Sequence, residues 1–474
     1  MTATTLPSPG PIDRSCRSPL FALFGGAAGW LALSSAFGLA AAMTFHNPAL
    51  LAGCSVLTFG RAYPAWAHLF IYGFGVPTAL GAGLWLLARL GRIKAMNPAL
   101  ITVGAKLWHV GVLVGLLGIV TGDSSGFEWL ELPRYAAVIL FLAFMLMTVW
   151  LFMTFSWRAE PRLYPSQWFV LAAVFWFIWI FSTAVFLLQM HPVRGVVQAA
   201  VAWWFAGNLL NVWLPLAGLA VTFYVLPKLS GKPLHSYYLA LFIFVTVALF
   251  GSWTGMPVQA PLPAWMGIFS STAAALMVVP ALALGILVVK TSGGGDQPPC
   301  FGGVLCFAKF GAFMLILATL LAAVAACPVM ARVTEFTWFT EGQVLLRLYG
   351  FFAMTLFAAV YHILPRISGR EISPRRVRAH FWLAMPGSLL LALPLLAGGV
   401  RQGLRLADAA VPFQETARAA VLWVRISTLG ETLIALGALV YLANVGWLIL
   451  SHYRALLKRE MTDALAWQPV EVKS

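Results

Sequence analysis

Charged residues are scarce in this chain of 474 residues, in which Asp, Glu, Lys and Arg make up only 9% and hydrophobic residues 61%. Soluble globular domains carry roughly 25% charged residues. The shortage therefore excludes a soluble protein and predicts an all-α integral membrane protein. Acidic residues are the rarer class, 15 against 30 Lys and Arg. The basic residues lie mainly between apolar runs, which indicates membrane orientation and not nucleic-acid binding.

The sequence also lacks any cysteine pattern that would indicate a metal site. Its five cysteines form no C-x-x-C motif and no Cys/His spacing of the metal-binding kind. Cys54 and Cys327 fall in segments that we expect on the same, oxidising side of the membrane. Because only geometry decides whether two cysteines can pair, a disulfide between them stays open at this point. The polar, proline-rich N-terminus contains no apolar segment typical of a cleavable signal peptide.

Twelve runs are long and apolar enough to cross a membrane, since a hydrocarbon core of about 30 Å needs roughly 20 residues per helix. Transmembrane strands are excluded because the runs show no alternation of polar residues. We expect a cytoplasmic tail over residues 1–19, a membrane domain over 20–451 and a second cytoplasmic tail over 452–474. The runs are Leu20–Met43, Ala65–Ala88, Ile101–Thr121, Tyr135–Phe155, Trp168–Met190, Ala200–Leu226, Tyr237–Trp253, Trp265–Val289, Val304–Ala326, Gln343–Leu364, Phe381–Leu396 and Ile426–Leu450.

The distribution of Lys and Arg predicts that both termini are cytoplasmic, because cytoplasmic loops are enriched in these residues. The odd-numbered gaps between runs hold the smaller set, which is Arg61, Arg134, Arg194, Arg332, Arg401, Arg405 and Arg418. The termini and even-numbered gaps hold the larger set, which is Arg14, Arg17, Arg89, Arg92, Lys94, Arg158, Arg162, Lys228, Lys232, Lys290, Arg366, Arg370, Arg375, Arg376, Arg378, Arg454, Lys458, Arg459 and Lys473. The acidic segment Asp123–Glu131 falls on the poorer side, which agrees with this orientation.

One stretch, Gly195 to Phe242, resembles a known family. It runs through a Trp-Trp-Phe cluster, ends its apolar part with Leu-Pro-Lys and continues through Lys-Pro-Leu-His-Ser-Tyr. This frame resembles subunit I of the heme-copper oxidases, most closely the cbb-type cytochrome c oxidases. The resemblance covers recognisable segments from Leu20 to Arg370. It implies a twelve-helix bundle in a bacterial inner membrane, two hemes, one copper ion and a membrane-bound c-type cytochrome subunit as partner.

The resemblance also implies six histidine ligands, because imidazole binds iron and copper and stays neutral when buried. The three copper positions are not histidines here. The first is Gly207, between Ala206 and Asn208, and the other two fall near Gly255, Met256 and Pro257. No histidine occurs anywhere between residues 236 and 361. Met256 is a soft donor that suits Cu(I), but a single thioether does not make a site, so packing is the expected role.

The heme-ligand positions have changed as well. The residues Gly60–Pro64 resemble the family's approach to a heme ligand, but Trp66 occupies the ligand position, and its indole offers only a donor. On the tenth run, Gln343 and Leu345 stand where the family has histidines. His68 is the one candidate substitute, although it lies about 200° around a helix of 3.6 residues per turn from Trp66. His362 lies about 25 Å along the axis from Leu345, too far to serve the same site.

Several polar residues fall within apolar runs. We expect His109 to be structural. Arg347, Arg425 and Glu431 each cost about 2.5–3.5 kcal/mol at the centre of a membrane, so they should face the bundle interior and pair, or line a proton or ion path. Arg347 and the bulky Trp66, Leu345, Leu346 and Tyr349 are expected to fill the space that the cofactors would occupy.

Three functional hypotheses remain from the sequence. The first is a degenerate, non-catalytic subunit that lies in the lipid bilayer and anchors or docks a c-type cytochrome in a respiratory complex, without catalytic residues, metal or heme of its own. The second is an active terminal oxidase or nitric oxide reductase with relocated ligands. The third is a transporter built on a twelve-helix bundle, for which no pair of discontinuous helices is evident.

Overall fold

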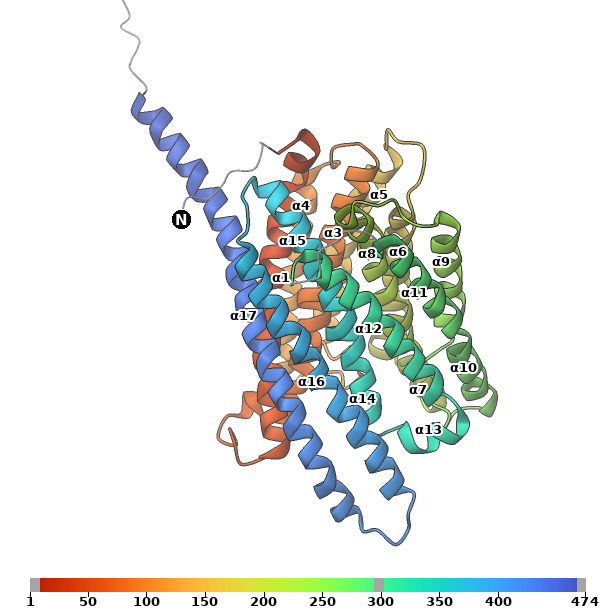
Figure 1. Ribbon diagram of the computed structural model, residues 1–474. Helices are drawn as coiled ribbons and strands as arrows, with labels where there is room; N and C mark the ends of the chain where they lie inside the picture. Colours follow the sequence, from red (N-terminus) through yellow and green to blue (C-terminus); the bar gives the residue numbers. More distant parts are fainter. Residues whose placement is uncertain (1–8, 294–301, 467–474) are drawn as a thin grey trace, which may run out of the picture.

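The computed structural model describes residues 9–293 and 302–466, and every regular element in these ranges is helical. Figure 1 shows a bundle in which most helices run roughly along one common direction. The elements of the first half are α1 (Pro11–His46), η1 (Ser55–Leu57), α2 (Phe59–His68), η2 (Leu69–Gly75), α3 (Val76–Leu90), α4 (Pro98–Thr121), α5 (Arg134–Ser156), α6 (Pro165–Val185), η3 (Phe186–Met190), α7 (Val196–Asn208), η4 (Leu209–Trp213) and α8 (Leu214–Ser230). Those of the second half are α9 (Tyr237–Gly251), α10 (Ala264–Leu276), α11 (Val278–Ser292), α12 (Val304–Ala325), α13 (Pro328–Thr334), α14 (Trp338–Leu345), η5 (Leu346–Ala353), α15 (Met354–Ser368), α16 (Pro374–Leu406) and α17 (Phe413–Ala466).

Within the described ranges, eleven helical stretches are long and apolar enough to cross a membrane. They correspond to eleven of the twelve predicted runs. The exception is the seventh run, which forms the shorter apolar helix α9 of 15 residues. At 1.5 Å per residue α9 is about 22 Å long, less than the thickness of the hydrocarbon core. The all-helical membrane class is therefore confirmed, whereas a full count of twelve spans is not.

The terminal helices are longer than their apolar cores. α1 begins at Pro11, within the predicted N-terminal tail, because a proline suits the first turn of a helix. α17 continues without a break through His452 to Ala466, so the described part of the predicted C-terminal tail extends the last helix. In Figure 1, α16 and α17 lie side by side as a long hairpin that projects beyond the rest of the bundle at its lower end.

Three spans form the interior of the bundle: Phe59–Leu90, Val196–Ser230 and Trp338–Ser368. Their apolar segments are almost entirely buried, whereas those of the other spans are about half buried and leave one face for lipid. Each inner span contains a π-helical segment near its middle, namely η2, η4 and η5. Such segments occur often at functional sites. The three inner spans are also those that carry Trp66, Gly207, Gln343 and Leu345.

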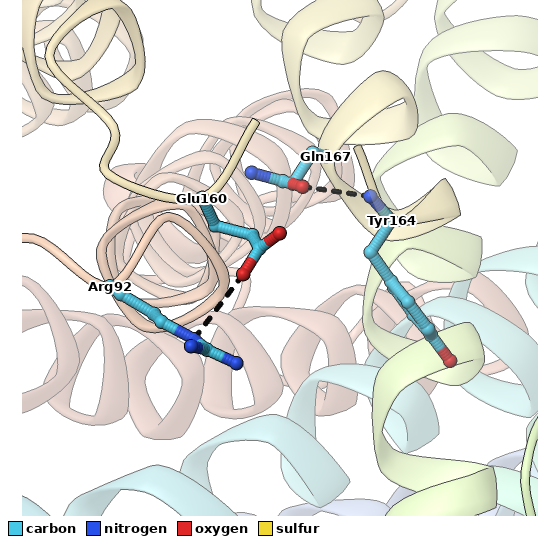
Figure 2. A network of polar contacts seen from close by, with 4 residues as sticks. All are labelled: Arg92, Glu160, Tyr164 and Gln167. Carbon is cyan, nitrogen blue, oxygen red and sulfur yellow. Dashed lines mark hydrogen bonds and ion pairs between the residues drawn. The ribbon is translucent and has the colours of Figure 1, made fainter. Parts of the chain in front are cut away.

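Short polar contacts tie together the two segments that connect α3 to α4 and α5 to α6. Arg92 Nε lies 3.5 Å from Glu160 Oε2, the single ion pair in the described ranges (Figure 2). The adjacent start of α6 is capped by Gln167, whose Oε1 accepts a hydrogen bond of 2.9 Å from the backbone N–H of Tyr164. Because the Arg92 side chain is 75% exposed, this ion pair adds little stability.

Cys54 and Cys327 are both exposed and both free. The disulfide that the sequence left open between them is thus not formed. Cys54 precedes η1 and Cys327 precedes α13, so both thiols lie in connections between helices and not within a span.

Candidate functional site

A cavity of about 300 Å³ lies among the inner spans, next to the positions where the family places copper and one heme. Gly207 of α7, Met256 of the connection between α9 and α10, and Gln343 of α14 all line it. Arg347 of η5 lines it too, beside apolar side chains. Ligand positions predicted from two runs and from the connection after the seventh run are therefore brought together around one space.

Gly207 meets the backbone of the segment after α9. A Cβ added at position 207 would overlap the carbonyl oxygen of Thr254 and lie 3.3 Å from Cα of Gly255. Gly255 itself has φ +101°, a left-handed conformation that favours glycine. Two glycines thus allow two backbones to touch. Main-chain atoms of residues 254–255 occupy the place into which a side chain at position 207 would project.

Asn208, next in sequence, fixes this close contact. Its Oδ1 accepts a hydrogen bond of 3.0 Å from Trp176 Nε1, and its Nδ2 donates to the carbonyl oxygens of Trp204 at 2.9 Å and Ser252 at 3.2 Å. Asn208 is fully buried. It joins α6, α7 and the end of α9, and sequence reasoning gave it no role. The feature that could have identified it in the sequence is a polar amide within an otherwise apolar run.

Glu335 shapes the cavity wall next to Met256. Its carboxylate oxygens accept hydrogen bonds from the backbone N–H groups of Val258 at 2.8 Å and Gln259 at 2.9 Å. The backbone N–H of Met256 donates to Ser270 Oγ at 3.0 Å. The segment after α9 is therefore held by hydrogen bonds through its main chain. Sequence reasoning missed Glu335, because its partners are backbone groups far away in the chain.

The neighbouring space at Trp66 is filled. Trp66 Nε1 donates a hydrogen bond of 2.9 Å to Tyr349 Oη, and the rings of Phe70 and Tyr349 lie 4.7 Å apart. Leu345 and Leu346 are buried. The cavity left beside Tyr349 measures about 10 Å³, room for one water at most. The predicted filling of vacated space is correct here, but it is wrong for the side of Gly207 and Gln343, where Arg347 borders a cavity that remains open.

His68 points away from this region. Its Nε2 lies 2.9 Å from the carbonyl oxygen of Val112 in α4, and its ring packs against Gly115. Trp66 instead faces Tyr349 in η5. The two residues thus lie on different faces of the helix, as their spacing predicts. His68 Nδ1 has no hydrogen-bond partner among the described residues.

Two other histidines, His109 and His380, form hydrogen bonds elsewhere in the bundle. His109 accepts a hydrogen bond of 3.0 Å from Trp30 Nε1, and its second ring nitrogen lies 3.0 Å from the carbonyl oxygen of Ala22, which fits a structural role. His380 Nδ1 lies 2.9 Å from Tyr361 Oη. In the ranges that the structure describes, no three His, Cys, Asp or Glu residues lie close enough to hold a metal ion.

Arg347, Arg425 and Glu431 do not form one network. Arg425 is exposed on α17, so the expectation that it faces the interior is wrong. Glu431 is buried, and a Cβ at Gly38 would meet its carboxylate, which places it against α1. No ion pair links any of the three within the described residues.

The α4–α5 connection contains two buried acidic side chains, Glu128 and Glu131, of which Glu128 lines the cavity. Burial raises the pKa of Glu131 to about 8, and it also raises the pKa of Glu128. Glu131 Oε1 accepts a hydrogen bond of 2.9 Å from the backbone N–H of Trp129. Glu128 and Trp129 line the cavity. A carboxyl with a pKa of about 8 is largely neutral at pH 7, so Glu131 adds little negative charge here.

The residues present do not fit the hemes and copper that the resemblance implies. The backbone of Thr254 blocks any side chain at position 207, Trp66 uses its only polar atom to donate to Tyr349, and Leu345 has no ligating atom. Of the ligand positions Trp66, Gly207, Gln343 and Leu345, only Gln343 has a side-chain oxygen, and this residue lines the cavity. Imidazole is the ligand type that these metals require in proteins of this kind. The arrangement is suited to packing and to holding a small polar ligand.

Comparison with known proteins identifies the family. The family described as "Cytochrome C and Quinol oxidase polypeptide I" matches residues 19–433. A cbb3-type cytochrome c oxidase subunit of Stutzerimonas stutzeri is 23% identical over 357 residues, which cover 73% of this chain and 75% of that protein. A bacteroid "Cytochrome c oxidase subunit 1 homolog" of Bradyrhizobium diazoefficiens is 24% identical over 489 residues, which cover 98% of this chain and 85% of the relative. The chain therefore belongs to the cytochrome c and quinol oxidase polypeptide I family.

Proposed function

We propose that this chain is a non-catalytic membrane subunit of a respiratory electron-transfer complex, in which it anchors or docks a membrane-bound c-type cytochrome. The observation that carries this proposal is the contact between Gly207 and the backbone of Thr254, which leaves no room for a ligand at the first copper position. The relatives' names as cytochrome c oxidase subunits support a respiratory setting. The chain has the helices of the family fold but no histidines at the ligand positions. Such a chain is better suited to binding a partner subunit than to reducing oxygen.

An active oxidase with relocated ligands is the weaker alternative. It needs a second imidazole facing the same space as His68, and the ring of His68 lies against α4 instead. His362 contacts the rings of Trp85 and Tyr224, and His380 contacts Tyr361. No two of these histidines converge on the cavity, whose lining within the described residues contains none.

We further propose that α9 crosses the bilayer as a twelfth span. Its start lies beside the end of α11, because Lys232 Nζ donates to the carbonyl oxygen of Gly293 at 2.7 Å and the backbone N–H of His235 to Thr291 Oγ1 at 3.2 Å. Its far end accepts the hydrogen bond from Asn208 at Ser252. The stretch α10–α11 is long enough to cross the membrane and returns to the level of Lys232. α9 must then cross the membrane in the direction opposite to α10–α11. The resulting twelve spans place both termini on the same side, and the distribution of Lys and Arg assigns this side to the cytoplasm.

A labelling experiment tests the orientation. Ser373→Cys lies at the start of α16, among five nearby arginines. It should react with a membrane-impermeant maleimide only when the reagent reaches the cytoplasmic face, in permeabilised cells or inside-out vesicles. Cys54 and Cys327 are exposed and free, so in the wild-type protein they provide an internal control that should react from the periplasmic side. Labelling of Ser373→Cys in intact cells, in a Cys54→Ser and Cys327→Ser background, would contradict the orientation.

A spectrum tests the missing cofactors. The chain purified without any cytochrome partner should show no b-type heme in a reduced-minus-oxidised spectrum or a pyridine hemochrome assay. Trp66→His combined with Leu345→His should not restore heme binding, because the neighbouring Tyr349 and Phe70 rings still fill the space. A stoichiometric b-type signal that disappears in His68→Ala would favour the active oxidase.

A separate experiment tests the docking role. Affinity purification of the tagged chain from its native membrane in mild detergent should recover a c-type cytochrome, recognised by its covalently bound heme. Recovery of the chain without any heme protein would contradict the docking role while leaving the spectrum of the isolated chain unaffected.

A further inference from the structure

We propose that the cavity beside Gly207 binds a small, planar, monovalent oxyanion of the formate or nitrate type, held by Arg347. This inference goes beyond the docking role. It depends on the proposed absence of heme only because the cavity must be free to admit a ligand.

Arg347 is the cation that points to such a ligand. It lies in η5, within the most deeply buried span of the described chain, and it lines the cavity. The described residues give it neither an ion pair nor a hydrogen-bond partner. An unpaired charge at membrane depth costs about 2.5–3.5 kcal/mol, and such residues normally pair or face water. A bound anion would offset this cost.

Two further polar groups on the cavity wall lack partners. Gln343 is buried, and its Nε2 has no hydrogen-bond partner among the described residues. The same holds for Ser271 Oγ on α10. Buried polar atoms are usually satisfied, so unpaired ones on a cavity wall indicate a ligand or water. Gln343 is one helical turn from Arg347, which places both side chains on the same face of the span.

The two carboxyl groups on the cavity wall do not neutralise Arg347. Glu335 uses both oxygens to accept hydrogen bonds from the main chain of residues 258 and 259. Glu128 lies at the other boundary, in the α4–α5 connection next to Trp129. Neither lies within 4 Å of the guanidinium, since the ion pair between Arg92 and Glu160 stands alone in the described ranges. The positive charge is therefore available to a ligand.

The chemistry of the guanidinium and the size of the cavity define the ligand class. A guanidinium presents a planar fork of donors that matches the two oxygens of a carboxylate or a similar planar oxyanion. A cavity of about 300 Å³ holds a small anion together with several waters. Leu210, Met277 and Val344 also line it, and these apolar side chains favour a monovalent ion over a divalent one, whose desolvation costs more.

Thermal unfolding of the purified full chain with increasing sodium formate or sodium nitrate tests the inference. A ligand that binds only the folded protein raises its unfolding midpoint in a saturable way. The wild-type midpoint should rise with both salts but not with formamide, the neutral analogue of formate. Arg347→Gln should need at least tenfold more formate for half of the effect, and Arg347→Lys should lie between the two. Arg425→Gln is the matched control on an exposed arginine and should respond like the wild type.

Ala322→Phe provides a second variant that leaves Arg347 in place and fills the cavity from α12. It should also need at least tenfold more formate, so the test survives if Arg347→Gln does not fold. An equal response in Arg347→Gln, an equal response to formamide, or no saturable response in the wild type would overturn the inference and leave water as the occupant. A heme spectrum of the same sample reports separately on the proposed function.

Discussion

Gly207→His should fail to create a copper site and should destabilise the protein. A Cβ at position 207 would overlap the carbonyl oxygen of Thr254, and one at Gly255 would lie 2.7 Å from Cα of Gly207. Overpacking of a filled interior costs about 1–3 kcal/mol, and more where the obstructing atom is backbone and cannot change rotamer. Metal analysis should find no more copper in the purified variant than in the wild type, and its thermal unfolding midpoint in detergent should fall.

Gly446→Ala is the matched control for this substitution. Gly446 lies within α17, and a Cβ there would meet no heavy atom within 4 Å. Because alanine has the higher helix propensity, by up to about 1 kcal/mol, this control should be neutral or slightly stabilising. One copper ion per chain in Gly207→His, or an unfolding midpoint like that of Gly446→Ala, would show that the segment of residues 254–255 moves aside readily and that the copper position is still accessible.

Hydropathy was enough to predict most of the fold, because each membrane helix must satisfy its own backbone and therefore needs a long apolar run. Its limits appear at α9 and at the ends of the chain. α9 has an apolar sequence but is short, so hydropathy does not decide whether it crosses the membrane. The hydrogen bonds of Lys232 to Gly293 and of Asn208 to Ser252, near the two ends of α9, support the path proposed above. α17 extends far beyond its apolar core, since polar residues can continue a helix outside the lipid.

The candidate site, like the fold, could be predicted from the sequence only in part. The prediction that Trp66, Gly207 and Leu345 offer no metal ligand rests on residue type alone, because residue type decides whether a side chain can bind a metal. Whether the vacated space closes depends on contacts between distant segments. Trp66 and Tyr349 close one side, whereas the other side stays open next to Arg347. Arg347 and Arg425 also had the same interpretation at the level of sequence, although only Arg347 lies in the interior.

Gly399→Ala and Gly403→Ala should each destabilise the protein strongly, because α16 packs backbone to backbone against the segments that border the cavity. A Cβ at position 399 would overlap the backbone nitrogen of Phe339 and lie 2.6 Å from its Cα. A Cβ at position 403 would overlap the carbonyl oxygen of Val333 and lie 2.6 Å from its carbonyl carbon. Glycines four residues apart lie on one face of a helix and allow such close approach in membranes.

The loss in each variant should be about 1–3 kcal/mol or more, read as a lower unfolding midpoint and as a loss of the monodisperse peak in size-exclusion chromatography. The double variant should lose less stability than the sum of the two single losses, since both glycines hold the connected segments α13 and α14.

Ala397→Leu is the control on the exposed face of the same helix, and it should change stability by no more than about 0.5 kcal/mol. Because Phe339 also lines the cavity, Gly399→Ala should weaken the response to formate as well. Normal stability in both glycine variants would mean that α16 can shift outward freely, and the α13–α14 segment would then not be fixed by this contact.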